Sequence, residues 1–267
     1  MDWLQASILA FIQGLTEFLP VSSSAHLILP SQLLGWNDQG IAFDVAVHLG
    51  TLIAVMAYFR RDITAIIGGS VQSLQQKKIN TQLTLAFAIV VATLPAVVVG
   101  GLFHDFIEIN LRSSWVIACT TIIFGLLLWA ADANSARCMK MDKMTVMFAF
   151  IIGCAQALAL MPGTSRSGIT MTAALFLGFD RTTSARFSML ISIPLIVAAG
   201  LLETLKLVES TGPVQWDMIF LGTFLAAVSA YACIHYFLQL LDRIGMLPFV
   251  IYRLLLGVFL MLFIGLV

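Results

Sequence analysis

Charged side chains are scarce in this sequence. Lysine and arginine together number 14, aspartate and glutamate also number 14, and these four types make up 10% of the 267 residues. A soluble domain carries roughly 25% charged residues. Because 60% of the chain is hydrophobic, it cannot cover a water-facing surface, and we expect lipid to surround most of it. The net charge of zero gives no indication of nucleic-acid binding.

Cysteine is sparse as well. The four thiols form no C-x-x-C pair, so the sequence indicates neither a disulfide framework nor a zinc or haem site. We interpret them as apolar side chains that are buried or face lipid. They are Cys119, Cys138, Cys154 and Cys233.

Long apolar runs dominate the sequence instead. A hydrocarbon core about 30 Å thick requires about 20 apolar helical residues to cross it. Six runs reach this length, and the sequence therefore predicts an all-α, polytopic membrane protein with six transmembrane helices. The predicted spans are 41–59, 84–103, 114–132, 186–206, 217–241 and 248–267.

Two further apolar stretches are interrupted by polar residues. The stretch 3–36 is broken by Pro20 and three consecutive serines, and the stretch 146–184 is broken by the polar segment 162–168. Proline and clustered polar residues interrupt a helix. Each stretch therefore resembles two half-length helices joined by a polar tip, which is a re-entrant helical hairpin.

The order of these elements predicts a duplication. One hairpin and three spans are followed by another hairpin and three spans, and an odd number of crossings turns the second half upside down. We therefore expect a single membrane domain, 1–267, built as an inverted-topology repeat of approximately 1–134 and 145–267. Such repeats place a site near the midplane, where their broken helices meet.

Basic residues indicate the orientation. Ten of them fall on one side of the predicted spans, and only Arg112 and Lys206 fall on the other. Cytoplasmic loops are enriched in lysine and arginine, so the sequence predicts that both termini lie outside. The ten residues are Arg60, Arg61, Lys77, Lys78, Arg137, Lys140, Lys143, Arg181, Arg186 and Arg243.

The first tip carries candidate catalytic residues. Glu17 follows Gln13 by one helical turn within an apolar segment, where a carboxylate is costly and normally faces a cavity. Ser23 precedes His26 by three residues, a spacing that places hydroxyl and imidazole on one helical face. We interpret them as a nucleophile and a proton-transfer partner. One serine of this cluster is also expected to cap a helix.

The second tip carries a permanent positive charge. Arg166 cannot lose its proton, and an arginine within a membrane needs an anion. Neighbouring hydroxyls, glycines and the N-terminus of a helix expected from Ile169 complete a predicted phosphate cradle. The structural alternative is an ion pair with Glu17 that only joins the repeats. The predicted phosphate-binding residues are Arg166, Ser165, Ser167, Thr170, Gly163, Gly168 and Ser22.

Other polar residues within the spans are interpreted as solvated. Asp44 and His48 share a helical face near the outer end of their span, where we expect interfacial solvation rather than support for the site. Arg253 lies near the cytoplasmic end of the last span. We expect its long side chain to extend the charge to the interface.

The two tips resemble the undecaprenyl-diphosphate phosphatase family of the bacitracin-resistance type. The family's (E/Q)xxxE motif runs here from Gln13 to Glu17, and its PGxSRSxxT motif is matched at every fixed position from Pro162 to Thr170. The similarity extends over the whole chain. Two positions depart from the pattern: Gln13 stands where some members have glutamate, and Ala25 stands where glycine is usual.

The resemblance implies a membrane-embedded phosphatase that hydrolyses undecaprenyl diphosphate to undecaprenyl phosphate and inorganic phosphate. The reaction recycles the lipid carrier for cell-wall synthesis and confers bacitracin resistance. The resemblance implies the bacterial cytoplasmic (inner) membrane, an active site open to the outer side, and a divalent cation, Mg²⁺ or Ca²⁺, with Glu17 and Gln13 as candidate metal ligands. The expected partners are the polyprenyl diphosphate and the bilayer, without nucleic acid. A homodimer is compatible with the sequence.

Residues and resemblance together suggest a mechanism with catalytic residues Ser23, His26, Glu17 and Arg166. Ser23 attacks the terminal phosphate, His26 or Glu17 takes its proton, and Arg166 stabilises the developing charge. His26 as the nucleophile is an open alternative. A different function is also open: a transporter or flippase of a lipid phosphate uses inverted repeats with broken helices, but needs no nucleophile.

Overall fold

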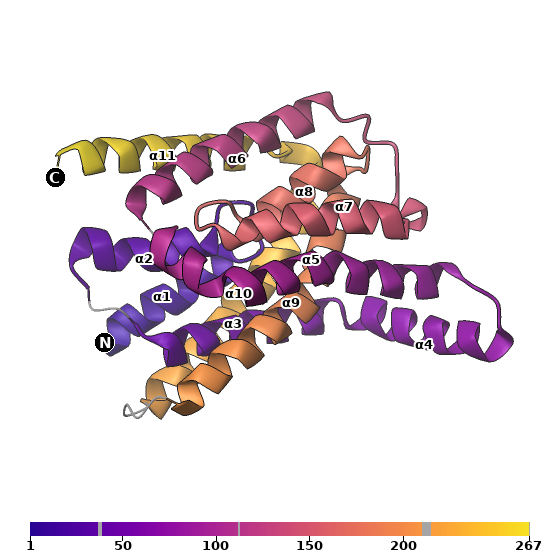
Figure 1. Cartoon of the computed structure of the whole chain (residues 1–267), viewed down its shortest axis with the longest axis horizontal. Helices are drawn as coiled ribbons and strands as arrows, with labels where there is room; N and C mark the ends of the chain where they lie inside the picture. The colour runs from indigo at the N-terminus through magenta and orange to yellow at the C-terminus, as the bar shows by residue number, and fades with distance from the viewer. Residues whose placement is uncertain (37–38, 112, 210–214, 267) are drawn as a thin grey trace.

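The computed structural model describes residues 1–36, 39–111, 113–209 and 215–266, and these residues are almost entirely helical (Figure 1). Two single turns of 3-10 helix, Met141–Lys143 and Leu158–Leu160, accompany the α-helices. The α-helices are α1 (Trp3–Thr16), α2 (Ser23–Leu34), α3 (Ile41–Tyr58), α4 (Arg60–Gln76), α5 (Thr81–Asn110), α6 (Ser114–Asn134), α7 (Val146–Ala157), α8 (Arg166–Phe176), α9 (Arg181–Glu209), α10 (Trp216–Ile244) and α11 (Leu247–Leu266).

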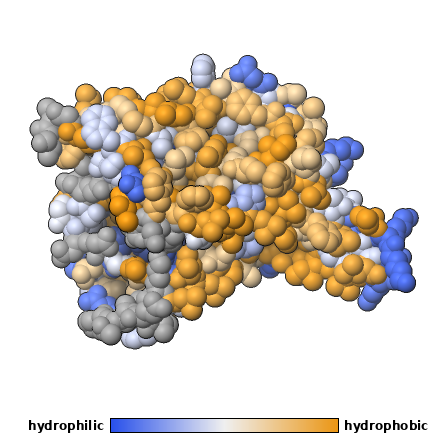
Figure 2. All heavy atoms as spheres, viewed as in Figure 1, coloured by the Kyte–Doolittle hydropathy of each residue, from blue (hydrophilic) through white to orange (hydrophobic). Residues whose placement is uncertain are grey.

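The six predicted spans are confirmed. Among the described residues, six helices are long and apolar enough to cross a membrane. Figure 2 shows hydrophobic side chains over the middle of the molecule and hydrophilic side chains gathered at the end where α4 and α5 are joined. The chain is therefore a multi-pass membrane protein. Its spans are Ile41–Tyr58, Thr81–Phe103, Ser114–Asn134, Arg181–Leu205, Trp216–Ile244 and Leu247–Ile264.

The segment between the first two spans, expected as a loop, is helix α4. It buries Ile66, while Ile67 and Leu74 are exposed. A helix with a polar face is not detected by a search for continuous apolar runs. Figure 1 shows α4 beside the first part of α5, with their connection at one end of the molecule and both chain termini at the opposite end.

Two basic residues of the predicted cytoplasmic side pair with acidic residues of other helices. Arg186 of α9 pairs with Asp62 of α4, and Arg181 pairs with Asp132 of α6. These contacts join helices that are distant in the sequence. Arg112 and the side chain of Lys206 lie outside the described residues.

Two pairs of shorter helices form the interrupted segments. The turn 17–22 joins α1 to α2, and the segment 158–165 joins α7 to α8. Helix α1 packs against α10, and α7 packs against α5. A Cβ atom on Gly14 would lie 2.7 Å from the Ala226 carbonyl oxygen, and one on Gly153 would lie 2.6 Å from that of Ala92. Glycine is therefore needed for the close approach of both helix pairs.

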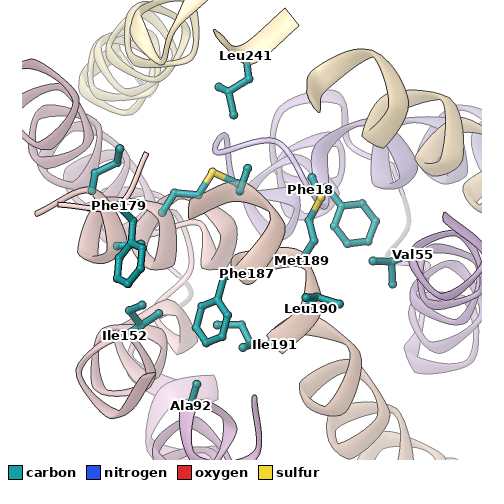
Figure 3. Packing of buried hydrophobic residues seen from close by; sticks show 14 of the residues in the cluster. Phe18, Val55, Ala92, Ile152, Phe179, Phe187, Met189, Leu190, Ile191 and Leu241 are labelled. Carbon is teal, nitrogen blue, oxygen red and sulfur yellow. The ribbon is translucent and has the colours of Figure 1, made fainter. Parts of the chain in front are cut away.

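The largest apolar cluster packs around the first turn. Phe18 is fully buried within this cluster. Other members are Val55 of α3, Phe187 and Leu190 of α9, and Ile152 of α7 (Figure 3). Interiors of this kind are packed as densely as organic crystals. The packing of Phe18 therefore restrains the backbone that carries its neighbour, Glu17.

Candidate active site

The two turns meet at a buried ion pair. Arg166 Nη2 lies 2.9 Å from Glu17 Oε1, and the two side chains are only 12% and 8% exposed. Arg166 Nη1 also donates to the backbone carbonyl of Ser188, at 3.1 Å. The ion pair between Arg166 and Glu17, which the sequence analysis gave as a structural alternative to phosphate binding, is therefore present. Removing one member of such a buried pair costs about 3–5 kcal/mol.

Ser23 is bonded to the same carboxylate. Its Oγ donates to Glu17 Oε2 at 2.7 Å, and Gln13 Nε2 donates to this oxygen at 3.0 Å. The Ser23 distance falls within the range in which a base takes a proton from a hydroxyl. The structure therefore brings together Gln13, Glu17, Ser23 and Arg166 from both turns.

His26 is directed elsewhere. Its Nδ1 lies 2.7 Å from the backbone carbonyl oxygen of Ser22, and its Nε2 is bonded to the hydroxyl of Tyr252. Neither nitrogen is bonded to Ser23, although the two residues were expected to share a helical face. The carbonyl four residues before His26 is the nearer partner for its ring.

Both turns end in the same unusual backbone conformation. Ser22 has φ 74° and Ser165 has φ 69°, a region that non-glycine residues rarely adopt. The next residue begins a helix in each case, Ser23 in α2 and Arg166 in α8. The predicted helix start at Ile169 is therefore wrong by three residues, because the sequence does not reveal the Ser165 cap. Both helix N-termini, with their partial positive charge, begin at the site.

Two hydroxyls predicted to bind phosphate are engaged within the protein. Ser165 Oγ accepts a hydrogen bond from the Gly168 backbone at 3.1 Å, which caps α8. Ser167 Oγ donates to the Leu19 carbonyl at 2.7 Å, which joins the second turn to the first. A Cβ on Gly168 would lie 3.0 Å from Arg253 Nη1. These residues therefore stabilise the geometry around Arg166.

Thr170 and Gly163 contact neighbouring helices. Thr170 Oγ1 lies 2.7 Å from Ser188 Oγ, which ties α8 to α9. Gly163 has φ +87°, and a Cβ atom there would meet the Thr120 hydroxyl. Glycine at this position is required by the backbone and by packing against α6.

Arg253 does not extend to the interface, and that expectation is wrong. Its side chain is fully buried. The guanidinium donates to the carbonyls of Thr121, Pro20 and Gly163 at 3.1, 3.3 and 2.9 Å. Turns leave backbone carbonyls without helical partners, and a buried arginine with five N–H donors can satisfy several of them. The sequence shows an arginine in an apolar run but not which distant carbonyls it serves.

His48 is closer to the site than the sequence suggested. Its Nε2 lies 3.9 Å from Glu17 Oε2, and its side chain is 37% exposed. Its Nδ1 is 2.7 Å from the Asp44 carbonyl oxygen. The presence of an imidazole within an apolar span was the feature of the sequence that could have indicated a role for His48 at the site.

Glu17 and Gln13 are the candidate oxygen donors for a metal at this site. Within the described part of the chain, no three residues of the types His, Cys, Asp and Glu gather as a metal site. Gln13 is fully buried, however, and its Oε1 has no hydrogen-bond partner among the described residues. Amide and carboxylate oxygens suit Mg²⁺ and Ca²⁺, so the pair Gln13 and Glu17 fits such a cation when a substrate supplies further oxygens.

Comparison with known proteins gives the family. Residues 6–259 match the family described as bacitracin resistance protein BacA. The chain is 60% identical to an undecaprenyl-diphosphatase of Alcanivorax borkumensis over 97% of both chains. It is 57% identical to one of Chromohalobacter salexigens, covering 99% of this chain and 100% of that protein. It is 58% identical to one of Teredinibacter turnerae, covering 97% and 98%. The chain belongs to the bacitracin resistance protein BacA family.

Proposed function

We propose that this protein hydrolyses undecaprenyl diphosphate to undecaprenyl phosphate and inorganic phosphate. The substrate follows from the names of its relatives. One observation carries the chemistry: Ser23 Oγ lies 2.7 Å from one oxygen of Glu17, whose other oxygen is paired with Arg166. A nucleophile, a base and an anion-binding group thus lie in one buried cluster. The reaction recycles the lipid carrier and confers resistance to bacitracin.

Ser23 is the nucleophile and Glu17 the base in this proposal. The Ser23 oxygen attacks the terminal phosphorus, its proton passes to Glu17 Oε2, and undecaprenyl phosphate leaves. Water then attacks the phosphoserine and its hydrogens leave with inorganic phosphate, while the proton held by Glu17 returns to the Ser23 oxygen as the P–O bond breaks. The hydrogen bond between Ser23 and Glu17 supports this assignment over His26, whose ring nitrogens have other partners.

Arg166 holds the transferred phosphate. A guanidinium has five N–H donors, and the bonds to Glu17 and Ser188 use two of them. The remaining donors and the N-terminus of α8 are suited to the charge that spreads over the phosphate oxygens in the transition state. Arg166 therefore both orients Glu17 and binds the anion.

A divalent cation, Mg²⁺ or Ca²⁺, would be held by Glu17 and Gln13. It would neutralise part of the diphosphate charge. The unpartnered Oε1 of Gln13 supports this assignment.

The architecture of the site is proposed to be an inverted repeat with two re-entrant hairpins, α1–α2 and α7–α8. The reciprocal packing of α1 on α10 and of α7 on α5 supports the duplication. The contact between the two turns supports hairpins that enter from opposite faces and meet within the membrane.

The orientation is proposed from charge. Arg60 and Arg61 begin α4, and Lys77 and Lys78 follow it. The connection after α4 lies at the end opposite the two chain termini (Figure 1), and these basic residues support a cytoplasmic location for that end. The protein then lies in the inner membrane with both termini outside and the first hairpin open to the outer side.

Transport of a lipid phosphate is the less well supported function. A flippase needs an anion site, but it has no use for a serine hydroxyl bonded to a buried carboxylate. The distinction is therefore chemical, and it is measured by release of phosphate.

Purified protein in detergent is incubated with farnesyl diphosphate or undecaprenyl diphosphate and Mg²⁺. The proposal expects release of inorganic phosphate that is lost in Ser23→Ala and retained in Ser31→Ala, a serine further along the same helix α2. Folded wild-type protein that moves the lipid across vesicles but releases no phosphate would support transport instead.

A further inference from the structure

The ring of His26 is held on both sides by groups that take no part in the proposed bond-breaking step. Nδ1 is 2.7 Å from the Ser22 carbonyl oxygen, and Nε2 is bonded to the Tyr252 hydroxyl. The rings of His26 and Tyr252 are stacked, with centroids 5.6 Å apart and planes 14° apart. Tyr252 belongs to α11. The last helix is thereby attached to the start of α2.

The partners of His26 define its tautomer. A carbonyl oxygen only accepts hydrogen bonds, so Nδ1 carries the hydrogen. In the neutral ring Nε2 then has the lone pair, and it accepts the hydrogen of Tyr252. Neither nitrogen has a lone pair directed at Ser23. His26 in this state is suited to holding a backbone group rather than to taking the proton of the nucleophile.

We infer that Tyr252 is a positioning residue that holds the ring of His26 through Nε2, and that His26 in turn holds the Ser22 carbonyl so that Ser23 is directed at Glu17. The inference rests on the proposed function. Ser22 has φ 74° and ψ 91°, and its side chain makes no capping bond to α2. A residue in so sparsely populated a conformation persists only where its surroundings restrain it. The His26 ring provides that restraint at the peptide that precedes Ser23.

A matched tyrosine is available as a control. Tyr252 and Tyr231 are each 43% exposed. Tyr231 of α10 contacts the ring of Tyr58 edge-on, with centroids 5.6 Å apart. Replacing either tyrosine by phenylalanine keeps the ring and removes only the hydroxyl, so a difference between the variants reports the bond to His26.

The tautomer is measured directly by ¹⁵N NMR of protein labelled at histidine, with His26 assigned from the His26→Asn variant. The wild-type ring is expected to carry its hydrogen on Nδ1, with an unprotonated Nε2. Tyr252→Phe is expected to keep the hydrogen on Nδ1 but to shift the Nε2 signal, because Nε2 loses the hydrogen bond that it accepts, and Tyr231→Phe to leave both signals unchanged. A wild-type ring protonated on Nε2, or an unaltered signal in Tyr252→Phe, would overturn the inference.

Activity separates positioning from chemistry. Tyr252→Phe is expected to lower kcat about 10-fold with KM changed less than about 2-fold, because it alters the alignment of reacting groups and not substrate affinity. Asparagine offers an N–H near the position of Nδ1 but cannot act as nucleophile or base. His26→Asn should therefore stay within about 10-fold of wild type, and His26→Ala should lose about 100-fold or more.

The contrary results are distinct. If His26→Asn is as inactive as His26→Ala, the ring takes part in chemistry and the positioning role is wrong. If the wild-type protein releases no phosphate at all, the proposed function fails, whereas the NMR comparison still decides whether Tyr252 holds the ring of His26.

Discussion

The two turns at the centre of the molecule have the same construction. A serine with positive φ, Ser22 in one and Ser165 in the other, stands immediately before a helix. Its hydroxyl lies 3.2 Å from that of the serine two residues later, Ser24 in the first turn and Ser167 in the second. The two hairpins therefore present the same backbone framework to each other.

The side chains on this framework are different. The first helical residue is Ser23 in one turn and Arg166 in the other. The residue four positions after the buried glutamine is Glu17 in the first hairpin and Leu160 in the second. One turn thus supplies a hydroxyl and a carboxylate, and the other supplies a cation. The comparison shows that the same backbone conformation recurs in both turns. Differences at single positions place the hydroxyl and carboxylate in one turn and the cation in the other.

The largest expected effect is at the serine unique to the first turn. Ser23→Ala removes the nucleophile and should lower turnover by about 1,000-fold or more while leaving the fold intact. Phosphate release by purified protein, together with thermal unfolding, measures both quantities. Ser24→Ala is the control and should keep activity within about 5-fold, since the bond of its hydroxyl among the described residues is to a neighbouring serine, Ser22. Comparable losses in both variants would mean that the hydroxyls have a shared structural role.

The next effect is at the cation of the second turn. Arg166→Lys keeps the charge but loses the planar fork that grips two oxygens. We expect turnover to fall about 100-fold, equivalent to about 2.7 kcal/mol of transition-state stabilisation. Arg186→Lys, at the pair with Asp62, should change turnover less than about 2-fold. Near-normal turnover in Arg166→Lys would reduce this residue to a point charge or a structural bridge.

A smaller effect separates the two buried glutamines. Gln13 and Gln156 are both fully buried, and each has an Oε1 without a partner among the described residues. Only Gln13 lies beside a carboxylate. Gln13→Ala should therefore raise the Mg²⁺ concentration needed for half-maximal activity about 10-fold, and Gln156→Ala should leave it unchanged. Equal metal dependence in both variants would remove Gln13 from the metal site.

The smallest effect on activity is expected for cysteine substitutions that test the orientation of the protein in the membrane. In a background without the four native cysteines, a cysteine replaces either Asn110 or Gln76, which are both exposed. Turnover should change less than about 2-fold. A membrane-impermeant thiol reagent applied to intact cells should label position 110 and not position 76. The reverse pattern would place both termini inside and turn the first hairpin toward the cytoplasm.

Much of the framework could be predicted from the sequence, because it depends on local composition. Apolar runs gave the spans, and interrupted runs located both turns. The pairing of Glu17 with Arg166 was the structural alternative that the sequence left open, and it is present. Helix α4 was not predictable from apolar runs, because its residues are polar on one side.

Contacts between distant segments were not predictable. Arg253 binds carbonyls in both turns, 233 and 90 positions away, and Tyr252 binds His26 from 226 positions away. No local pattern encodes such pairs. The spacing of Ser23 and His26 suggested a reactive pair, because residues three apart share a helical face. This spacing does not indicate that the His26 ring binds the Ser22 carbonyl instead. The hydrogen-bond partners of individual hydroxyl groups could therefore be identified from the structure but not from the sequence.

The most direct test of the account is to identify the residue that carries phosphate during turnover. The protein is mixed with undecaprenyl diphosphate labelled in its terminal phosphate, quenched within a single turnover, digested and analysed by mass spectrometry. The account predicts acid-stable phosphate on the peptide that contains Ser23, absent from Ser23→Ala and strongly reduced in Glu17→Gln, which lacks the base that takes the Ser23 proton. Acid-labile phosphate on His26, or undiminished turnover in Ser23→Ala, would contradict the assignment of Ser23 and Glu17 as nucleophile and base.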